Sequence, residues 1–115
     1  MSANVKVSKD EYLIHEGDES SEMFYLQSGT LNVYKRIGDQ EKQIGTVYPG
    51  EVVGEMSFLD KSPRCASVRA VTDCELVAVP SEKFDKMFKD LPLWYRALVN
   101  TLLDRLRKAN SRVRI

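Results

Sequence analysis

The chain has 115 residues, and its 17 Lys and Arg residues balance 17 Asp and Glu residues. This length fits one domain with a modest core, and the composition, 43% hydrophobic and 30% charged, excludes a disordered chain. The neutral total also lacks the excess of positive charge that nucleic-acid and membrane binders usually carry. The balance is uneven along the chain. Residues 93–115 carry six Lys or Arg and one Asp, so an acidic body precedes a basic end.

Turn-forming residues divide the first half of the chain into short strands. All six glycines lie between Gly17 and Gly54, and apolar residues cluster or alternate between them. The predicted strands are 23–26, 30–34, 43–47, 51–53, 65–71 and 75–79. We expect a hairpin turn at Gly38-Asp39 and a turn at Thr72-Asp73 before the last strand. Many short strands at near-regular spacing indicate a sandwich or a barrel.

The last third of the chain predicts two helices, at about 81–90 and 92–113. Ser81 is a suitable N-cap for the first, with Glu82 in its first turn. Pro92 can occupy the first turn of the second, and no Gly or Pro follows it.

The second predicted helix has apolar residues at the spacing of a coiled-coil seam. They are Tyr95, Val99, Leu102, Leu106, Ala109 and Val113, with a second stripe at Trp94 and Leu98. The seam predicts a homodimer formed through this helix. It lasts under three heptads, so one broad amphipathic face packed on a single core is the alternative.

The chain contains no apolar run of signal-peptide or membrane-spanning length. Its two cysteines, Cys65 and Cys74, are too few for a disulfide framework. We therefore expect a cytoplasmic protein with reduced thiols and no membrane partner.

The segment 54–68 carries the candidate ligand-binding chemistry. A strand ends at Gly54, a short helix-compatible run begins at Glu55, and Arg64 precedes the next strand. Backbone N–H groups at the start of a short helix favour an anion, and an arginine fork can bind the same anion. The Glu55 carboxylate is an acceptor suited to a sugar hydroxyl. A phosphate and a sugar hydroxyl bound close together indicate a nucleotide.

These residues resemble the phosphate-binding cassette of the cyclic nucleotide-binding domain family, which includes the catabolite activator protein and protein kinase A regulatory subunits. The matching parts are Gly54-Glu55 and the run Pro63-Arg64-Cys65-Ala66-Ser67-Val68. His15-Glu16-Gly17-Asp18 resembles the family's early glycine-aspartate turn. The resemblance implies a mainly β fold with flanking α. Residues 1–115 would form one domain, with a β-roll (jelly-roll) sandwich at about 5–80 followed by two C-terminal helices.

The resemblance also implies roles for residues at the phosphate side of the ligand. Arg64 would bind the exocyclic phosphate, and Glu55 would accept a hydrogen bond from the ribose 2′-hydroxyl. Backbone amides would complete the phosphate cradle near Gly54, Met56, Ser57 and Ala66.

Four further residues are implied at the base. Val33 and Ile44 would line the base pocket. Asn110 would hydrogen-bond the edge of the base, and Arg105 would stack on it. An equally good interpretation is that Asn110 is a solvated residue on the helix surface and does not contact the base.

Cys65 bears on which nucleotide binds. In this family Thr at this position is associated with cGMP, whereas Ala or Ser is commoner in cAMP binders. A thiol is a poor hydrogen-bond donor, so Cys65 favours cAMP over cGMP. The alternative role for this residue is a redox-sensitive thiol.

The favoured function is a sensor in which the bound ligand repositions the C-terminal helix and so regulates a dimer or an attached effector. We expect no enzyme, metal or cofactor, because the single histidine, His15, supplies neither a ligand cluster nor a placed catalytic base. A degenerate β-roll module for dimerisation or docking, without a nucleotide, is the alternative. We expect no DNA-binding domain within these residues, and an effector following Ile115 in a longer protein.

Overall fold

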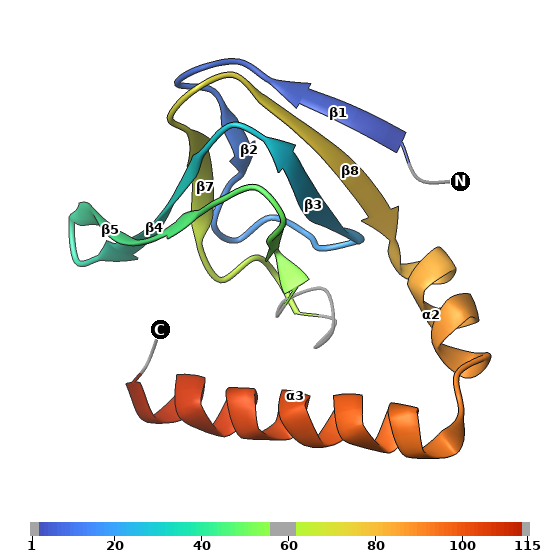
Figure 1. Cartoon of the computed structure of the whole chain (residues 1–115). Coiled ribbons are helices and arrows are strands. Elements are labelled where there is room, and N and C mark those ends of the chain that lie inside the picture. The colour runs from blue at the N-terminus through green and yellow to red at the C-terminus, as the bar shows by residue number, and fades with distance from the viewer. Residues whose placement is uncertain (1–2, 56–61, 114–115) are drawn as a thin grey trace. The chain divides into compact units, whose positions relative to one another are not determined.

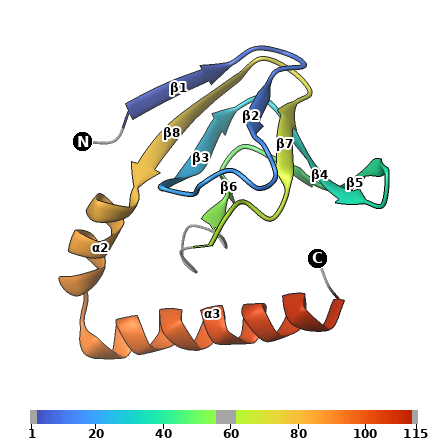
Figure 2. The same ribbon diagram turned by 180° about the vertical axis from the view of Figure 1, so that it is seen from behind.

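The computed structural model describes residues 3–55 and 62–113, with side chains described through residue 109. The chain divides into a unit of strands that ends at Ser81 and a unit of helices that begins at Glu82. Figure 1, and Figure 2 from behind, show the strands wrapped into a roll and the two helices following them in the chain. The predicted fold class, a β-roll followed by two C-terminal helices, is confirmed.

The strands form two four-stranded sheets, and every pair of neighbours is antiparallel. The first sheet has the order β1 (Ala3–Val7), β8 (Cys74–Pro80), β3 (Glu22–Ser28) and β6 (Val52–Val53). The second has the order β2 (Tyr12–Ile14), β7 (Ser67–Ala70), β4 (Leu31–Ile37) and β5 (Gln40–Val47).

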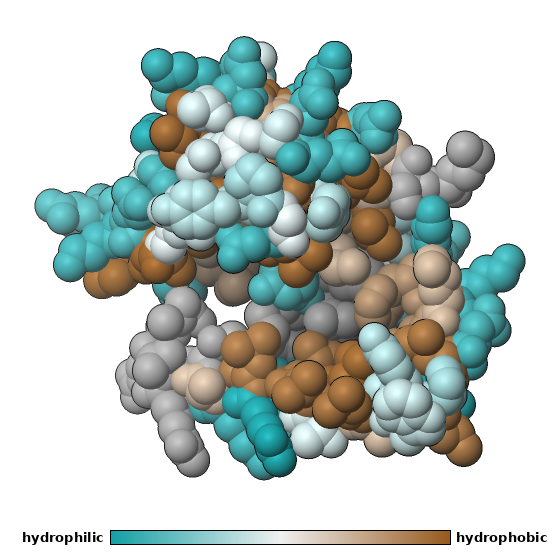
Figure 3. All heavy atoms as spheres, in the orientation of Figure 1, coloured by the Kyte–Doolittle hydropathy of each residue, from teal (hydrophilic) through white to brown (hydrophobic). Residues whose placement is uncertain are grey.

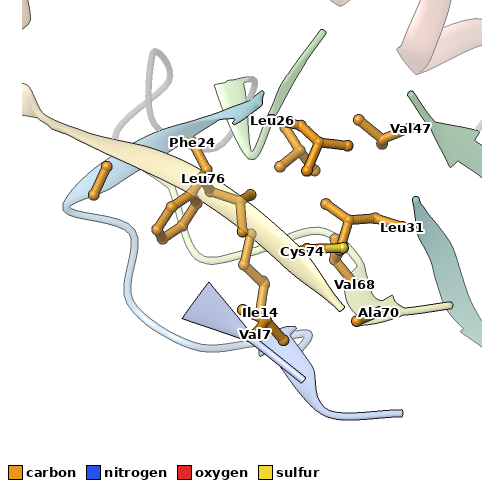
Figure 4. Packing of buried hydrophobic residues seen from close by; sticks show 12 residues of the cluster. Val7, Ile14, Phe24, Leu26, Leu31, Val47, Val68, Ala70, Cys74 and Leu76 are labelled. Atoms are coloured by element: carbon orange, nitrogen blue, oxygen red, sulfur yellow. The ribbon is translucent and has the colours of Figure 1, made fainter. Parts of the chain in front are cut away.

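The core lies between the inward faces of the two sheets, as Figure 4 shows for twelve of its side chains. Leu26 and Leu76 from the first sheet and Leu31 from the second are fully buried. Strand β8 alternates buried and more exposed residues, as expected of a strand with one face on the core.

Two of the corners at which the chain crosses from one sheet to the other pack together. Gly29 and Thr30 join β3 to β4, and residues 71–73 join β7 to β8. Thr30 donates its backbone N–H to Thr72 Oγ1 at 3.1 Å and accepts from Val71 N–H at 2.9 Å. Gly29 has φ +92°, and a side chain there would overlap the Asp73 carbonyl and Cys74. Both a left-handed backbone and close packing therefore require glycine at this corner.

The predicted strands 65–71 and 75–79 are present as β7 and β8 and flank the expected turn, and the structure adds that they belong to different sheets. Strands β1 and β2 were not predicted at all. In β1 only Val7 is buried, and β2 is three residues long, so neither carries a clear alternating pattern.

The helical unit contains α2 (Ser81–Lys89) and α3 (Leu93–Val113). The rings of Phe84 and Phe88 stack on α2 with centroids 5.7 Å apart. The Pro92 carbonyl accepts hydrogen bonds from the backbone N–H groups of Tyr95 and Arg96, each at 3.0 Å, and so begins α3. Within the described residues, no helix combines the length and apolar character needed to cross a bilayer.

Large apolar side chains are exposed along α3, and Figure 3 shows them gathered over this helix. The exposed residues are Leu93, Trp94, Tyr95, Leu98, Leu102 and Leu106. They include three members of the predicted seam and both residues of the second stripe, whereas Val99 is half-buried.

The packing of the two corners predicts that Gly29→Ala is more damaging than a matched substitution at Gly38. Both glycines have positive φ, but the position at Gly38 opens onto empty space. We expect Gly29→Ala to lower the free energy of unfolding by about 2–4 kcal/mol, from backbone strain plus overpacking, against about 1 kcal/mol for Gly38→Ala. Urea unfolding followed by circular dichroism measures both, and equal losses would contradict the packing argument.

Candidate functional site

Arg64 is a buried cation inside the β-roll. The residue is 7% exposed. Nη2 donates to the Glu22 carbonyl at 2.6 Å, and Nη1 donates to the Gly54 carbonyl at 3.1 Å. The guanidinium carbon lies 5.8 Å from the centroid of the Phe24 ring. The planar fork thus joins the start of β3 to the end of β6, a span that a single ammonium group would bridge less well.

The backbone of Arg64 is held by the turn at 15–18. Arg64 N–H donates to the Asp18 carbonyl, and Gly17 N–H donates to the Arg64 carbonyl, each at 2.8 Å. Glu16 N–H donates to Ser67 Oγ, near the end of the cassette, at 2.8 Å. The early glycine-aspartate turn and the cassette are distant in sequence, but these hydrogen bonds make them neighbours that orient one another.

Burial lowers the pKa of the Arg64 guanidinium, because a charged group loses water around it. The carboxylates of Glu22 and Asp18 oppose this shift and favour the charged form. Arginine remains protonated throughout the ordinary pH range, so Arg64 carries a permanent positive charge here.

Gly54 allows the Arg64 guanidinium to approach the backbone closely. Its φ is +80°, and a Cβ at this position would lie 2.5 Å from Arg64 Nη1 and 3.2 Å from Ile14 Cδ1. Any larger residue would push the guanidinium away from the carbonyl that it contacts. Glu55, next in the chain, is half-buried.

The cassette ends at the start of β7, where Cys65 is exposed and Ala66 is half-buried. Lys35, on the neighbouring strand β4, donates from Nζ to the Cys65 carbonyl at 2.9 Å. Sequence reasoning missed both Lys35 and Glu22. The available signal for Lys35 was its place on the same face of β4 as Leu31 and Val33.

Val33 and Ile44, the two predicted base-lining residues, come together at a bulge between β4 and β5. Val33 packs against the core cluster and is paired with Val68 of β7 and Gly45 of β5. Ile44 falls at the register shift next to this pair and is 39% exposed. A bulge redirects the side chains around it. The structure thus places Val33 beside β7, the strand that follows the cassette, and Ile44 one strand further out, on β5.

The outer face of the second sheet carries a hydrogen-bonded network that supports β4. Arg69 donates to Tyr34 Oη at 3.2 Å and lies over the rings of Tyr12 and Tyr34. Tyr12 Oη donates to Glu41 at 2.9 Å, and this bond raises the pKa of the Tyr12 hydroxyl. These contacts join β2, β7, β4 and β5 on the side away from the core.

Four further predicted residues lie on α3 or outside the described part of the chain. Met56 and Ser57 lie outside the described residues. Arg105 and Asn110 lie on α3, in the helical unit, where Arg105 is exposed. The roles of these four residues stay predictions. Within residues 3–55 and 62–113 there is no group of three or more His, Cys, Asp or Glu that could hold a metal ion.

The chain matches the family described as the cyclic nucleotide-binding domain over residues 4–90. The cyclic AMP receptor protein of Thermus thermophilus is 35% identical over 99 residues, which cover 85% of this chain and 46% of that protein. The chain therefore spans about half the length of this relative.

Solved structures show the same likeness. The EAL enzyme Bd1971 in its cAMP-bound form has a TM-score of 0.80 at 28% identity, covering 96% of this chain and 30% of that chain. Its cGMP-bound form has a TM-score of 0.81 at 27% identity, with the same coverage. The regulatory domain of Toxoplasma gondii PKA, crystallised with cAMP, has a TM-score of 0.72 at 33% identity, covering 74% of this chain and 33% of that chain.

The contacts of Arg64 predict that its removal destabilises the empty protein. Arg64→Leu leaves the Glu22 and Gly54 carbonyls without their donor, so the free energy of unfolding should fall by about 1–3 kcal/mol. Arg36→Leu is the control, because Arg36 is exposed and its side chain reaches one carbonyl only at 3.5 Å. Urea unfolding without nucleotide measures both. An Arg64→Leu protein as stable as the parent would show that these carbonyl contacts contribute nothing.

Proposed function

Because this chain belongs to the cyclic nucleotide-binding domain family, we propose that it is a non-enzymatic sensor that binds a cyclic nucleotide at the cassette around Arg64. The observation that carries the proposal is the buried guanidinium of Arg64, which a glycine at position 54 allows to approach the backbone. A permanent charge in a partly dry site is an effective anchor for a phosphate, since an anion there meets little screening.

The phosphate would bind at the guanidinium together with nearby backbone amides. Arg64 has five N–H donors, and its fork matches the geometry of phosphate oxygens. Ala66, two residues on, offers a backbone N–H from the end of the cassette. Glu55 would accept from the ribose 2′-hydroxyl, and the Val33–Ile44 region of β4 and β5 would contact the base.

We take cAMP as the preferred nucleotide. The exposed Cys65 thiol, next to Arg64, is a poor donor and offers little to the amino group of guanine. The similar proteins point to cyclic nucleotides without choosing between them, since one is named as a cyclic AMP receptor and another is solved with each nucleotide.

Ligand binding would act on the helical unit by shifting its population between two placements. Asn110, or Arg105 in its stead, would contact the base from α3 in the bound state and so favour that placement. A contact made in one state only is what couples binding to the helix, because equal affinity for both states would shift nothing.

The exposed apolar side chains of α3 support a homodimer formed through this helix. The positive charge at its basic end would attract an acidic surface of a partner or of an attached effector domain. Repositioning α3 would then change the dimer or the effector. Both cysteines are free thiols, which suits a cytoplasmic protein.

The competing proposal is a docking module that binds no nucleotide. The Gly54–Arg64 arrangement argues against it, because a glycine that admits a buried guanidinium has no evident use in docking. Binding measurements separate the two directly.

We predict that the protein binds cAMP and cGMP, with cAMP the tighter, and that Gly54→Ala weakens both about tenfold or more by displacing the guanidinium of Arg64. Gly50→Ala is the matched control, because Gly50 also has positive φ (+94°) but faces open space. Isothermal titration calorimetry measures all three proteins. Heat from neither nucleotide with the parent protein would support the docking module instead.

We also predict that Asn110→Ala uncouples the helix response while leaving most of the binding energy intact. The phosphate contacts lie on the β-roll, whereas Asn110 lies on α3. A fluorescent probe on α3, followed during the same titration, should show a smaller ligand-induced change at saturating cAMP. A response that falls only in proportion to affinity would refute this division of roles.

A further inference from the structure

Lys35 occupies an unusual place for a lysine, on the inward face of β4 beside the cassette. It lies two residues after Val33, so alternation puts both on the same face of the strand. Tyr34 is paired with Ser67 of β7, which makes Lys35 the next position along, across from Ala66. The side chain is half-buried, and Nζ lies 2.9 Å from the Cys65 carbonyl oxygen.

The Cys65 carbonyl and the Ala66 N–H belong to the same peptide unit. This unit is planar and trans, so its C=O and N–H point to opposite sides. A contact that holds the Cys65 oxygen towards Lys35 therefore also sets the direction of the Ala66 N–H, away from Lys35. No acceptor for that N–H is found within the described part of the chain.

The charge on Lys35 also affects the strength of the Ala66 donor. A hydrogen bond from an ammonium group is about twice as strong as a neutral one. It polarises the peptide that accepts it, and hydrogen bonds in such a chain strengthen one another. Among the residues that the structure describes, Lys35 forms no ion pair that would compete for its charge.

We propose that Lys35 is a positioning residue of the phosphate cradle, whose ammonium orients and polarises the Cys65–Ala66 peptide so that the Ala66 N–H can bind the ligand's phosphate. This role rests on the proposed function, since it requires a nucleotide phosphate at the cassette. Lys35 acts through the peptide, and the Arg64 guanidinium remains the direct charge partner of the phosphate.

The test compares three variants of the full chain. Lys35→Met removes the ammonium and keeps the length of the side chain. Lys42→Met removes the same charge from the residue that pairs with Lys35 across the β4–β5 hairpin, at an exposed position with no described contact to the cassette. Lys35→Arg restores a charged donor.

The first measurement needs no ligand. In the ¹H–¹⁵N spectrum of the empty protein, the Ala66 amide should shift in Lys35→Met, stay near its parental position in Lys42→Met, and return towards it in Lys35→Arg. An Ala66 amide that responds equally to both Met substitutions, or to neither, would overturn the proposal, since the peptide would then not depend on Lys35.

The second measurement is calorimetry with cAMP and with cGMP, repeated at about 1 M salt, where the screening length is only about 3 Å. Lys35→Met should weaken both nucleotides by a similar factor, about three- to tenfold, and the loss should persist in salt. Lys42→Met should bind like the parent protein, and Lys35→Arg should recover most of the loss.

The possible outcomes distinguish a failure of the proposed function from a failure of the role of Lys35. A parent protein that binds neither nucleotide overturns the proposed function and this role with it. A parent that binds, with Lys35→Met unchanged, overturns the role of Lys35 alone. If Lys35→Met weakened the binding of one nucleotide only, Lys35 would act at the base. If high salt abolished the loss of affinity, Lys35 would act only as a long-range charge. Either result would contradict the proposal.

Discussion

The site depends on one buried charge, the guanidinium of Arg64. A cation inside a small β-roll is costly unless polar groups replace the water that it loses. Here two backbone carbonyls accept from its fork, and two carboxylates nearby favour its charged form. The neighbouring segments also accommodate this group. The 15–18 turn hydrogen-bonds the Arg64 backbone, and Gly54 leaves space for its guanidinium. The empty protein thus keeps the cation oriented in advance of any ligand.

The roll supplies the rigid frame that this charge requires. Its two sheets share a core of aliphatic side chains, and the chain passes between the sheets at corners that interlock around Gly29. Because the corners, the core and the outer network of Arg69 all involve β4 or its neighbours, the strand that carries Val33 and Lys35 has little freedom to shift. At the proposed ligand site, little binding energy would then be spent on ordering this strand.

The helices have the opposite character. The largest apolar side chains of α3 are mostly exposed, and α2 has no buried residue among those described. A segment with few buried contacts changes its placement at low cost, which is what a responding element needs. The proposed response to a nucleotide would rely on this difference between the roll and the helices.

Local patterns in the sequence determined which segments form strands and helices, because glycine turns and apolar periodicity act over a few residues. The stretch after Gly54, with Arg64 and its flanking residues, pointed to the cassette through its resemblance to the family's motif. The tertiary structure decided what spacing cannot express: that β7 and β8 separate into different sheets, that the 15–18 turn clamps Arg64, and that Lys35 reaches the Cys65 carbonyl. The sequence pattern did not predict the edge strands β1 and β2, because so few of their side chains are buried. These contacts join residues that are distant in sequence, so they exist only once both sheets have closed around a common core.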